Sequence, residues 1–296
     1  MQVREIQVRS ILTRTGGFLR RGYSHTVNPY GGCAFGGALC GMPCYAQHNT
    51  WVTQGRAWGS FLDVKVNAAG LYREQAPRER RWASRRGGLR IYMSSVTDPY
   101  VPQERSYRIT RGLLEAMLDL PPDRLVLQTH TPYPLWDLEA LRALARRVAD
   151  LCVNISVETD REQMGDGFPP HATPLGERIE ALGRLRQAGI RTVAVVAPML
   201  PIDDPGAFAR RLGEAADRVL LDHFLLGDGS PNGLRTQRTG FPARLEAAGL
   251  SAWTSLDRFE EICATFRDVL GSERVLVSCE GFNAPGPGCA GPVASR

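Results

Sequence analysis

Three of the seven cysteines of this 296-residue chain fall within a short segment rich in glycine and proline. They are Cys33, Cys40 and Cys44, and the segment runs from Asn28 to Ala46. Glycine lets so short a tether turn its thiols toward one point, and clustered cysteines in such a setting rarely arise from core packing. Three thiolates suit a [4Fe–4S] cluster with one open iron, or a zinc site whose fourth ligand comes from elsewhere, with His48 nearby. The cysteine segment alone does not distinguish the iron–sulfur site from the zinc site.

The composition, 43% apolar and 23% charged, is typical of a soluble globular protein. No apolar run is long enough to span a membrane, and the N-terminus lacks the apolar region of a secretory signal. We therefore expect a cytoplasmic protein without membrane contact, in which cysteines serve metal or redox chemistry rather than disulfides. The net charge of +5 is carried almost entirely by arginine, with Lys65 as the only lysine, and it permits nucleic-acid binding without requiring it.

Strand-like and helix-like periodicity alternate along most of the chain. The predicted strands are Tyr23–Val27, Phe61–Val66, Leu89–Ser94, Arg124–Thr129, Cys152–Glu158, Thr192–Ala197, Arg218–Phe224 and Arg274–Ser278. The predicted helices lie near Ala68–Gln75, Tyr107–Leu118, Leu135–Leu151, Leu175–Ala188, Pro205–Ala216 and Leu256–Leu270. Such strand–helix units predict an α/β protein with a parallel sheet, closed or partly closed into a β/α barrel. No GxGxxG opens a helix, which argues against a dinucleotide-binding sheet, and we expect one domain over residues 1–296.

Polar residues follow the predicted strands where each strand ends. The stretches are Ser94–Tyr100, Thr129–Thr131, Ser156–Asp160, Ala197–Met199 and Asp222–His223. In β/α barrels the carboxyl ends of the strands meet at one face, where the chemistry takes place. The cysteine segment and these strand ends are therefore predicted to form one site.

Five stretches, in order, resemble the radical S-adenosylmethionine (SAM) proteins related to spore photoproduct lyase, often labelled DNA repair photolyase-like. The first is Asn28–Cys33 with Cys44–Ala46, which resembles their cluster-binding loop. The others are Val64–Ala68, Thr97–Tyr100 with Glu104 and Leu113–Glu115, Thr129–Pro132 with Trp136–Leu138, and Asn154–Ser156 with Glu177–Leu182, Ala188–Ile190 and Ala197–Pro201. Together they cover roughly residues 25–225, and their common order makes the resemblance specific.

The resemblance implies a partial (β/α)6 barrel of the TIM type over about residues 24–226, with a C-terminal extension over about residues 227–296. It implies that Cys33, Cys40 and Cys44 ligate a [4Fe–4S] cluster whose open iron binds SAM. Reductive cleavage of SAM would give methionine and a 5′-deoxyadenosyl radical that abstracts hydrogen from a substrate. An electron donor such as flavodoxin or ferredoxin would be a partner. The lyase relatives act on a thymine dimer in DNA, so a nucleic-acid lesion is one candidate substrate.

The matched positions imply roles for four residues that would contact SAM. Thr97 and Asp98 match a polar pair that contacts its methionyl part. Ser156 matches a polar residue near the ribose or carboxylate, and Ala197 lies where the backbone passes the adenine. These four residues are predicted to bind the cofactor.

Two further residues carry implied roles that compete with ordinary structural ones. Tyr45 matches an aromatic residue that lines the site and relays hydrogen in the lyase branch, and simple packing is the alternative. His130 stands where relatives have lysine; its imidazole can still donate a hydrogen bond to a carboxylate or a ribose hydroxyl, and a core or capping histidine is the alternative.

The sequence also departs from the family's pattern. The family spacing is CxxxCxxC, whereas six residues separate Cys33 from Cys40 and three separate Cys40 from Cys44, so a loop without a catalytic cluster is the competing interpretation. Phe35 replaces a usual histidine, and Pro43 precedes the last cysteine.

Two more cysteines lie in a second glycine- and proline-rich stretch near the C-terminus, beyond the resemblance. Cys279 is predicted to face the barrel mouth as a hydrogen donor or extra ligand, whereas Cys289 is as well explained as a tail thiol. Cys152 and Cys263 follow strand and helix patterns and are predicted to be core residues.

Two functions therefore compete. The first is a radical SAM enzyme with an unidentified substrate. The second is a zinc- or iron-binding nucleic-acid module that uses the arginine-rich surface without radical chemistry.

Overall fold

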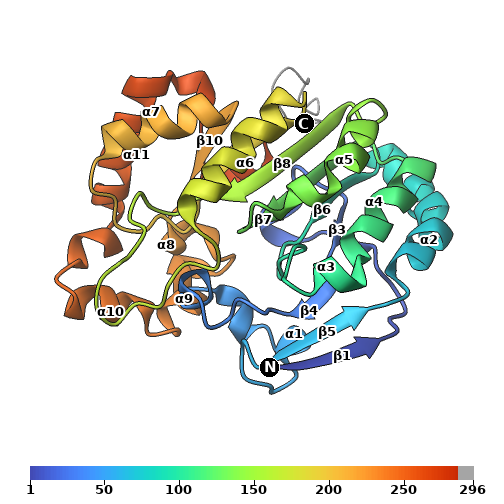
Figure 1. Ribbon diagram of the computed structural model, residues 1–296, viewed down its shortest axis with the longest axis horizontal. Helices are drawn as coiled ribbons and strands as arrows, with labels where there is room; N and C mark the ends of the chain where they lie inside the picture. Colours follow the sequence, from blue (N-terminus) through green and yellow to red (C-terminus); the bar gives the residue numbers. More distant parts are fainter. Residues whose placement is uncertain (286–296) are drawn as a thin grey trace.

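A mostly parallel sheet of eight strands organises the computed structural model, which describes residues 1–285 (Figure 1). The strands are β2 (Thr13–Arg14), β3 (His25–Val27), β6 (Arg90–Met93), β7 (Arg124–Thr129), β8 (Asp150–Ser156), β9 (Arg191–Val196), β10 (Arg218–Leu221) and β11 (Val275–Val277). They lie in the order β11–β10–β9–β8–β7–β6–β3–β2. Every neighbouring pair is parallel except β2 with β3. The predicted α/β fold with a parallel sheet is confirmed.

Six longer helices follow strands and pack beside the sheet (Figure 1). They are α2 (Ala68–Ala83), α4 (Ile109–Asp119), α5 (Leu138–Ala145), α6 (Leu175–Gln187), α7 (Pro205–Ala215) and α11 (Leu256–Leu270). The short helices are α1 (Thr50–Thr53), α3 (Glu104–Tyr107), α8 (Phe224–Gly227), α9 (Leu234–Gln237), α10 (Phe241–Ala247) and α12 (Ser278–Asn283). Among the described residues, no helix combines the length and apolar content needed to cross a bilayer.

Side chains alternate along each strand, so the sheet has two different faces. One face joins the helices in the main core and contributes Ile91, Leu125, Val153, Ala194 and Val219. The other face carries a smaller apolar cluster that includes Tyr92, Val126, Cys152, Val193 and Leu220. Two to four residues further along the same strands, this second face turns polar, with Gln128, Ser156 and Asp222. The carboxyl end of that face is where the site lies.

A separate three-stranded sheet carries the cysteine segment. It consists of β1 (Gln2–Ile6), β5 (Phe61–Lys65) and β4 (Tyr30–Gly32), in the order β1–β5–β4. Cys33 follows β4 directly. The ammonium group of Lys65, the only lysine, donates to the carbonyl of Asn28 at 2.6 Å, and burial lowers its pKa to about 8. The lone lysine thus anchors the start of the cysteine segment.

Two predicted helices differ in length from the observed ones. The helix expected over Leu135–Leu151 is shorter, since α5 ends at Ala145, and Leu151 pairs with Leu125 in the sheet. The apolar residues at the end of the predicted helix fit a strand as well as a helix, and they form a strand because they pair with β7. The helix expected to stop near Gln75 continues to Ala83, because Pro77 lies on its exposed side, where a lost backbone hydrogen bond is tolerated.

Candidate active site

One cavity of about 570 Å³ opens at the carboxyl ends of the parallel strands. Nine of the predicted site residues line it: Cys33, Cys40, Cys44, Tyr45, Thr97, Asp98, His130, Ser156 and Ala197. They come from the cysteine segment and from the ends of four strands, which is the juxtaposition that the strand-end pattern predicts. The structure therefore brings these residues to one place, although their roles stay predictions.

Close backbone packing shapes the cysteine segment. Gly36 lies against Gly59, and Gly41 lies against the carbonyl of Gly36, so that a Cβ on either would overlap backbone atoms. The amide of Leu39 donates to the carbonyl of Pro170 at 2.8 Å, which ties the segment to the loop after β8. The extra glycines thus let the longer spacing fold back on itself.

Substitution of Gly36 by alanine is expected to destabilise the apoprotein by about 1–3 kcal/mol, because the new methyl group overpacks the contact with Gly59. Gly37 is the matched control: a Cβ there meets no atom within 4 Å, so its alanine variant should stay within about 0.5 kcal/mol of the parent. Urea unfolding of the two variants measures both values. Equal stabilities would mean that the segment does not need the close packing seen here.

Burial strongly affects the three thiols. It raises the pKa of Cys33 to about 12 and that of Cys44 to about 11. Burial, with the nearby Glu158 carboxylate, raises the pKa of Cys40 well above its usual value. Ionised thiols at this depth therefore need positive charge beside them, which iron or zinc would supply.

The donor set can be compared with both predicted metal sites. Within residues 1–285, no three His, Cys, Asp or Glu side chains are arranged to hold a single metal ion. A [4Fe–4S] cluster makes a different demand, because each cysteine binds a different iron. Three cysteines without disulfide partners line one cavity, with Cys33 buried and Cys40 and Cys44 partly buried, and such a set fits that demand.

Thr97 and Asp98 are held firmly at the end of β6. The Thr97 hydroxyl donates to the carbonyl of Tyr30 at 3.0 Å. One carboxylate oxygen of Asp98 accepts from the Thr129 hydroxyl at 2.7 Å, and the other accepts from the amide of His130 at 2.7 Å. Asp98 thus joins the loops that follow β6 and β7 and fixes this part of the cavity wall.

A buried ion pair lies behind His130. The side chain of Arg178 in α6 is fully buried and donates to Oε2 of Glu158 at 3.0 Å, while Nε2 of His130 lies 3.2 Å from Oε1. Burial alone would raise the pKa of Glu158, but Arg178 and His130 outweigh it and hold the pKa below its usual value. The pair fixes a negative charge beneath the imidazole.

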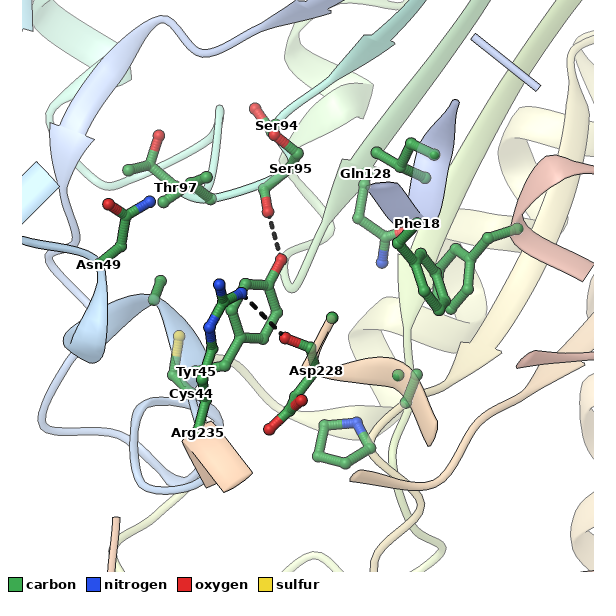
Figure 2. A pocket seen from close by; sticks show the side chains of 18 of the residues that line it. Phe18, Cys44, Tyr45, Asn49, Ser94, Ser95, Thr97, Gln128, Asp228 and Arg235 are labelled. Atoms are coloured by element: carbon green, nitrogen blue, oxygen red, sulfur yellow. Dashed lines mark hydrogen bonds between the residues drawn. The ribbon is translucent and has the colours of Figure 1, made fainter. Parts of the chain in front are cut away.

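The centre of the cavity holds a second hydrogen-bonded chain. Gln128 donates to the Ser156 hydroxyl at 2.8 Å and accepts from the Tyr92 hydroxyl at 2.9 Å. The Tyr45 hydroxyl donates to the carbonyl of Ser95 at 2.6 Å (Figure 2), and burial raises its pKa. Tyr45 is therefore a neutral phenol with a fixed orientation in the cavity.

No protein-family model matches the chain. An uncharacterized protein of Methanocaldococcus jannaschii is 27% identical over 181 residues, 61% of this chain and 62% of that protein. A protein of Pseudomonas phage M6 named radical SAM Nalpha-GlyT isomerase is 29% identical over 176 residues, 59% of this chain and 33% of that protein. The matches therefore span less than two thirds of either relative.

Spore photoproduct lyase in complex with dinucleoside spore photoproduct superposes with a TM-score of 0.58 and 15% identity, over 93% of this chain and 81% of that chain. The chain has the radical SAM fold of spore photoproduct lyase. A variant of the lyase with bound AdoMet and the same photoproduct gives the same TM-score over 93% of this chain and 80% of that one. The predicted partial barrel is thus confirmed at the level of the fold.

Cys279, the tenth predicted site residue, lies outside the wall of the cavity in this radical SAM fold. Cys279 is the second residue of α12, and its thiol donates to the carbonyl of Phe18 at 3.3 Å. The role predicted for Cys279, as a hydrogen donor or an extra ligand, stays a prediction. Cys289 lies outside the described residues, whereas Cys152 and Cys263 are buried, as predicted.

Part of the cavity wall was not predicted. It includes Phe18, Asp228, Arg235 and Phe282, together with the predicted strand-end residue Asp222 (Figure 2 shows Phe18, Asp228 and Arg235). Arg235 lies in α9, which contacts the turn Tyr45–His48 at the end of the cysteine segment. Asp222 stood at a predicted strand end, and its place on the polar face follows from alternation with Leu220. The other four residues carry no sequence pattern that would have placed them in the cavity wall.

Proposed function

We propose that the protein is a radical SAM enzyme that holds a [4Fe–4S] cluster on Cys33, Cys40 and Cys44. The observation that carries the proposal is that three cysteines and four polar strand ends line one cavity. The fold of spore photoproduct lyase and the phage relative named as a radical SAM isomerase support it. When bound and reduced, the cluster supplies the electron that cleaves SAM to methionine and a 5′-deoxyadenosyl radical.

The chain's own residues would bind and orient the cofactor. Ser156, oriented by Gln128, presents a hydroxyl to the ribose or carboxylate, and Ala197 presents backbone to the adenine. The two carboxylate oxygens of Asp98 accept from Thr129 and from the amide of His130, so its contribution is to position Thr129 and His130 near the methionyl part. His130, flanked by Glu158, offers its imidazole where relatives have lysine.

The cavity would also keep the radical away from water and side reactions. Aromatic side chains, among them Phe18, Tyr45 and Phe282, make up much of its wall. Tyr45, a neutral phenol, would line the radical site and relay hydrogen, which is the role implied for this position. A low-polarity enclosure limits quenching of a reactive intermediate.

The substrate class follows only from the relatives. Solved structures of the lyase hold a dinucleoside spore photoproduct, so a nucleic-acid lesion is our proposed substrate class. An electron donor such as flavodoxin or ferredoxin would reduce the cluster.

Anaerobic reconstitution with iron and sulfide tests the cluster. We expect about four iron and four sulfide ions per chain, with the broad absorbance of a [4Fe–4S] cluster. Zinc alone, together with salt-dependent DNA binding, would overturn the proposal and favour a metal-binding nucleic-acid module.

A further inference from the structure

Asp222 is a buried carboxyl group with one unused oxygen. The residue is 3% exposed and lines the cavity just after β10. Its Oδ1 is buried without a hydrogen-bond partner, whereas its other contacts are with the Ser278 hydroxyl and the amide of His223. A buried carboxyl oxygen without a partner costs free energy, and a hydrogen-bond donor on an occupant of the cavity would offset that cost.

The surroundings of Asp222 do not offer that partner. Gly227 packs against the carboxyl so closely that any side chain there would overlap it, which holds Asp222 in place. The neighbouring Asp228 is engaged within its own loop, where it accepts from the amides of Ser230 and Thr236 at 2.8 Å. Burial raises the pKa of Asp222 to about 7, and the nearby Asp228 carboxylate adds to the effect.

A second residue with an unpartnered polar atom lines the same cavity. Ser94, at the end of β6, is 7% exposed, and its hydroxyl also lacks a partner. Its φ of 76° is an unfavourable left-handed conformation for a residue with a Cβ, and such strain concentrates at functional sites. The cavity thus presents two polar positions that the protein itself leaves unsatisfied.

The walls near Asp222 indicate the shape of the missing ligand. Phe18 and Phe282 both line the cavity with ring centroids 5.5 Å apart, and Phe224 also lines it. Flat apolar surfaces in a cavity with a buried acceptor suit a planar ring that carries a hydrogen-bond donor on its edge. Arg235 also lines the cavity, and its guanidinium suits an anionic group attached to that ring.

We propose that Asp222 is a specificity-determining residue whose Oδ1 accepts a hydrogen bond from a ring N–H of a planar heterocyclic substrate. This inference rests on the proposed function, because it assigns the substrate side of the same cavity. A nucleobase of a free nucleoside and a nucleobase in a strand offer the same ring N–H.

Binding of thymidine and of its N3-methyl derivative to the reconstituted protein tests the proposal, with ten-residue oligothymidylate and its N3-methylated form as the strand-borne probes. We expect the parent protein to bind one of these pairs and to prefer the unmethylated member at least tenfold, since methylation removes the ring N–H. Asp222→Leu, which has no acceptor, should reduce that preference to about one, whereas Asp222→Asn, which keeps an acceptor oxygen, should retain most of it. Asp268→Leu on the exposed side of α11 is the matched control and should leave the preference unchanged.

Binding of neither pair by the parent protein, or an equal preference in the parent and Asp222→Leu, would overturn the inference. Circular dichroism melting of each variant separates loss of recognition from loss of folding, and retained preference in Asp222→Asn shows that the pocket is intact. The proposed function is measured separately by iron content and 5′-deoxyadenosine. A protein that cleaves SAM but shows no preference for the ring N–H therefore fails this inference alone.

Discussion

Replacing Cys40 with alanine is expected to lower the iron content of the reconstituted protein from about four ions per chain to below one. The cluster needs all three thiolates, and Cys40 is the one cysteine between Cys33 and Cys44 in the widened loop. Its side chain lines the cavity with the other two, which is the geometry that the proposal requires. Iron and acid-labile sulfide, measured after anaerobic reconstitution, check this result.

Cys263 provides the matched control for that substitution. It is a buried cysteine that lies in α11 within the main core and does not line the cavity. Cys263→Ala should keep about four irons per chain even if it is somewhat less stable. Unchanged iron in Cys40→Ala would contradict the assignment of Cys40 as a cluster ligand and would return the wide spacing to the competing interpretation.

Substitution of Arg178 by methionine is expected to destabilise the protein by about 3–5 kcal/mol. The reason is that Glu158, 2% exposed, would be left as a buried charge without its main partner. Arg178 also donates to the carbonyls of Ser156 and Thr173, at 3.1 and 2.8 Å, so its loss would loosen the wall behind His130. Urea unfolding at neutral pH measures the loss.

The double variant Arg178→Met, Glu158→Gln separates the charge from the packing. It should recover part of the lost stability, because no ionised group is then buried alone. The ion pair stabilises the protein above the usual pKa of glutamate, about 4.3, and this contribution disappears as the pH falls below it. The loss of stability in Arg178→Met, relative to the parent protein, should therefore be smaller at pH 4 than at pH 7. An equal loss of stability at pH 7 and pH 4 would show that the buried charge of Glu158 is not its cause.

Periodicity was sufficient to predict most of the sheet. Arg124–Thr129 and Leu256–Leu270 match β7 and α11 in their bounds, because their apolar residues fit only one period. The ends of the parallel strands account for five of the nine site residues around the cavity, since parallel strands bring their carboxyl ends together, and the cysteine segment accounts for the other four.

Other features depend on tertiary contacts that the sequence does not display. Arg178 looks like a surface residue of an amphipathic helix. It is fully buried, because Glu158 and two backbone carbonyls accept hydrogen bonds from its guanidinium group. Cys279 follows a strand, as predicted, but the chain enters α12 there and turns its thiol toward Phe18. The packing of Gly36 against Gly59 joins two loops that carry no periodic signal. Sequence periodicity does not predict which loops contact one another in the fold.

The formation of 5′-deoxyadenosine tests the central claim most directly. The reconstituted protein, incubated anaerobically with SAM and dithionite, is expected to release 5′-deoxyadenosine and methionine, even without substrate, and Cys40→Ala is expected to release none. Chromatography with mass detection quantifies both products. A protein that holds about four irons yet yields no 5′-deoxyadenosine above the Cys40→Ala background would contradict the claim.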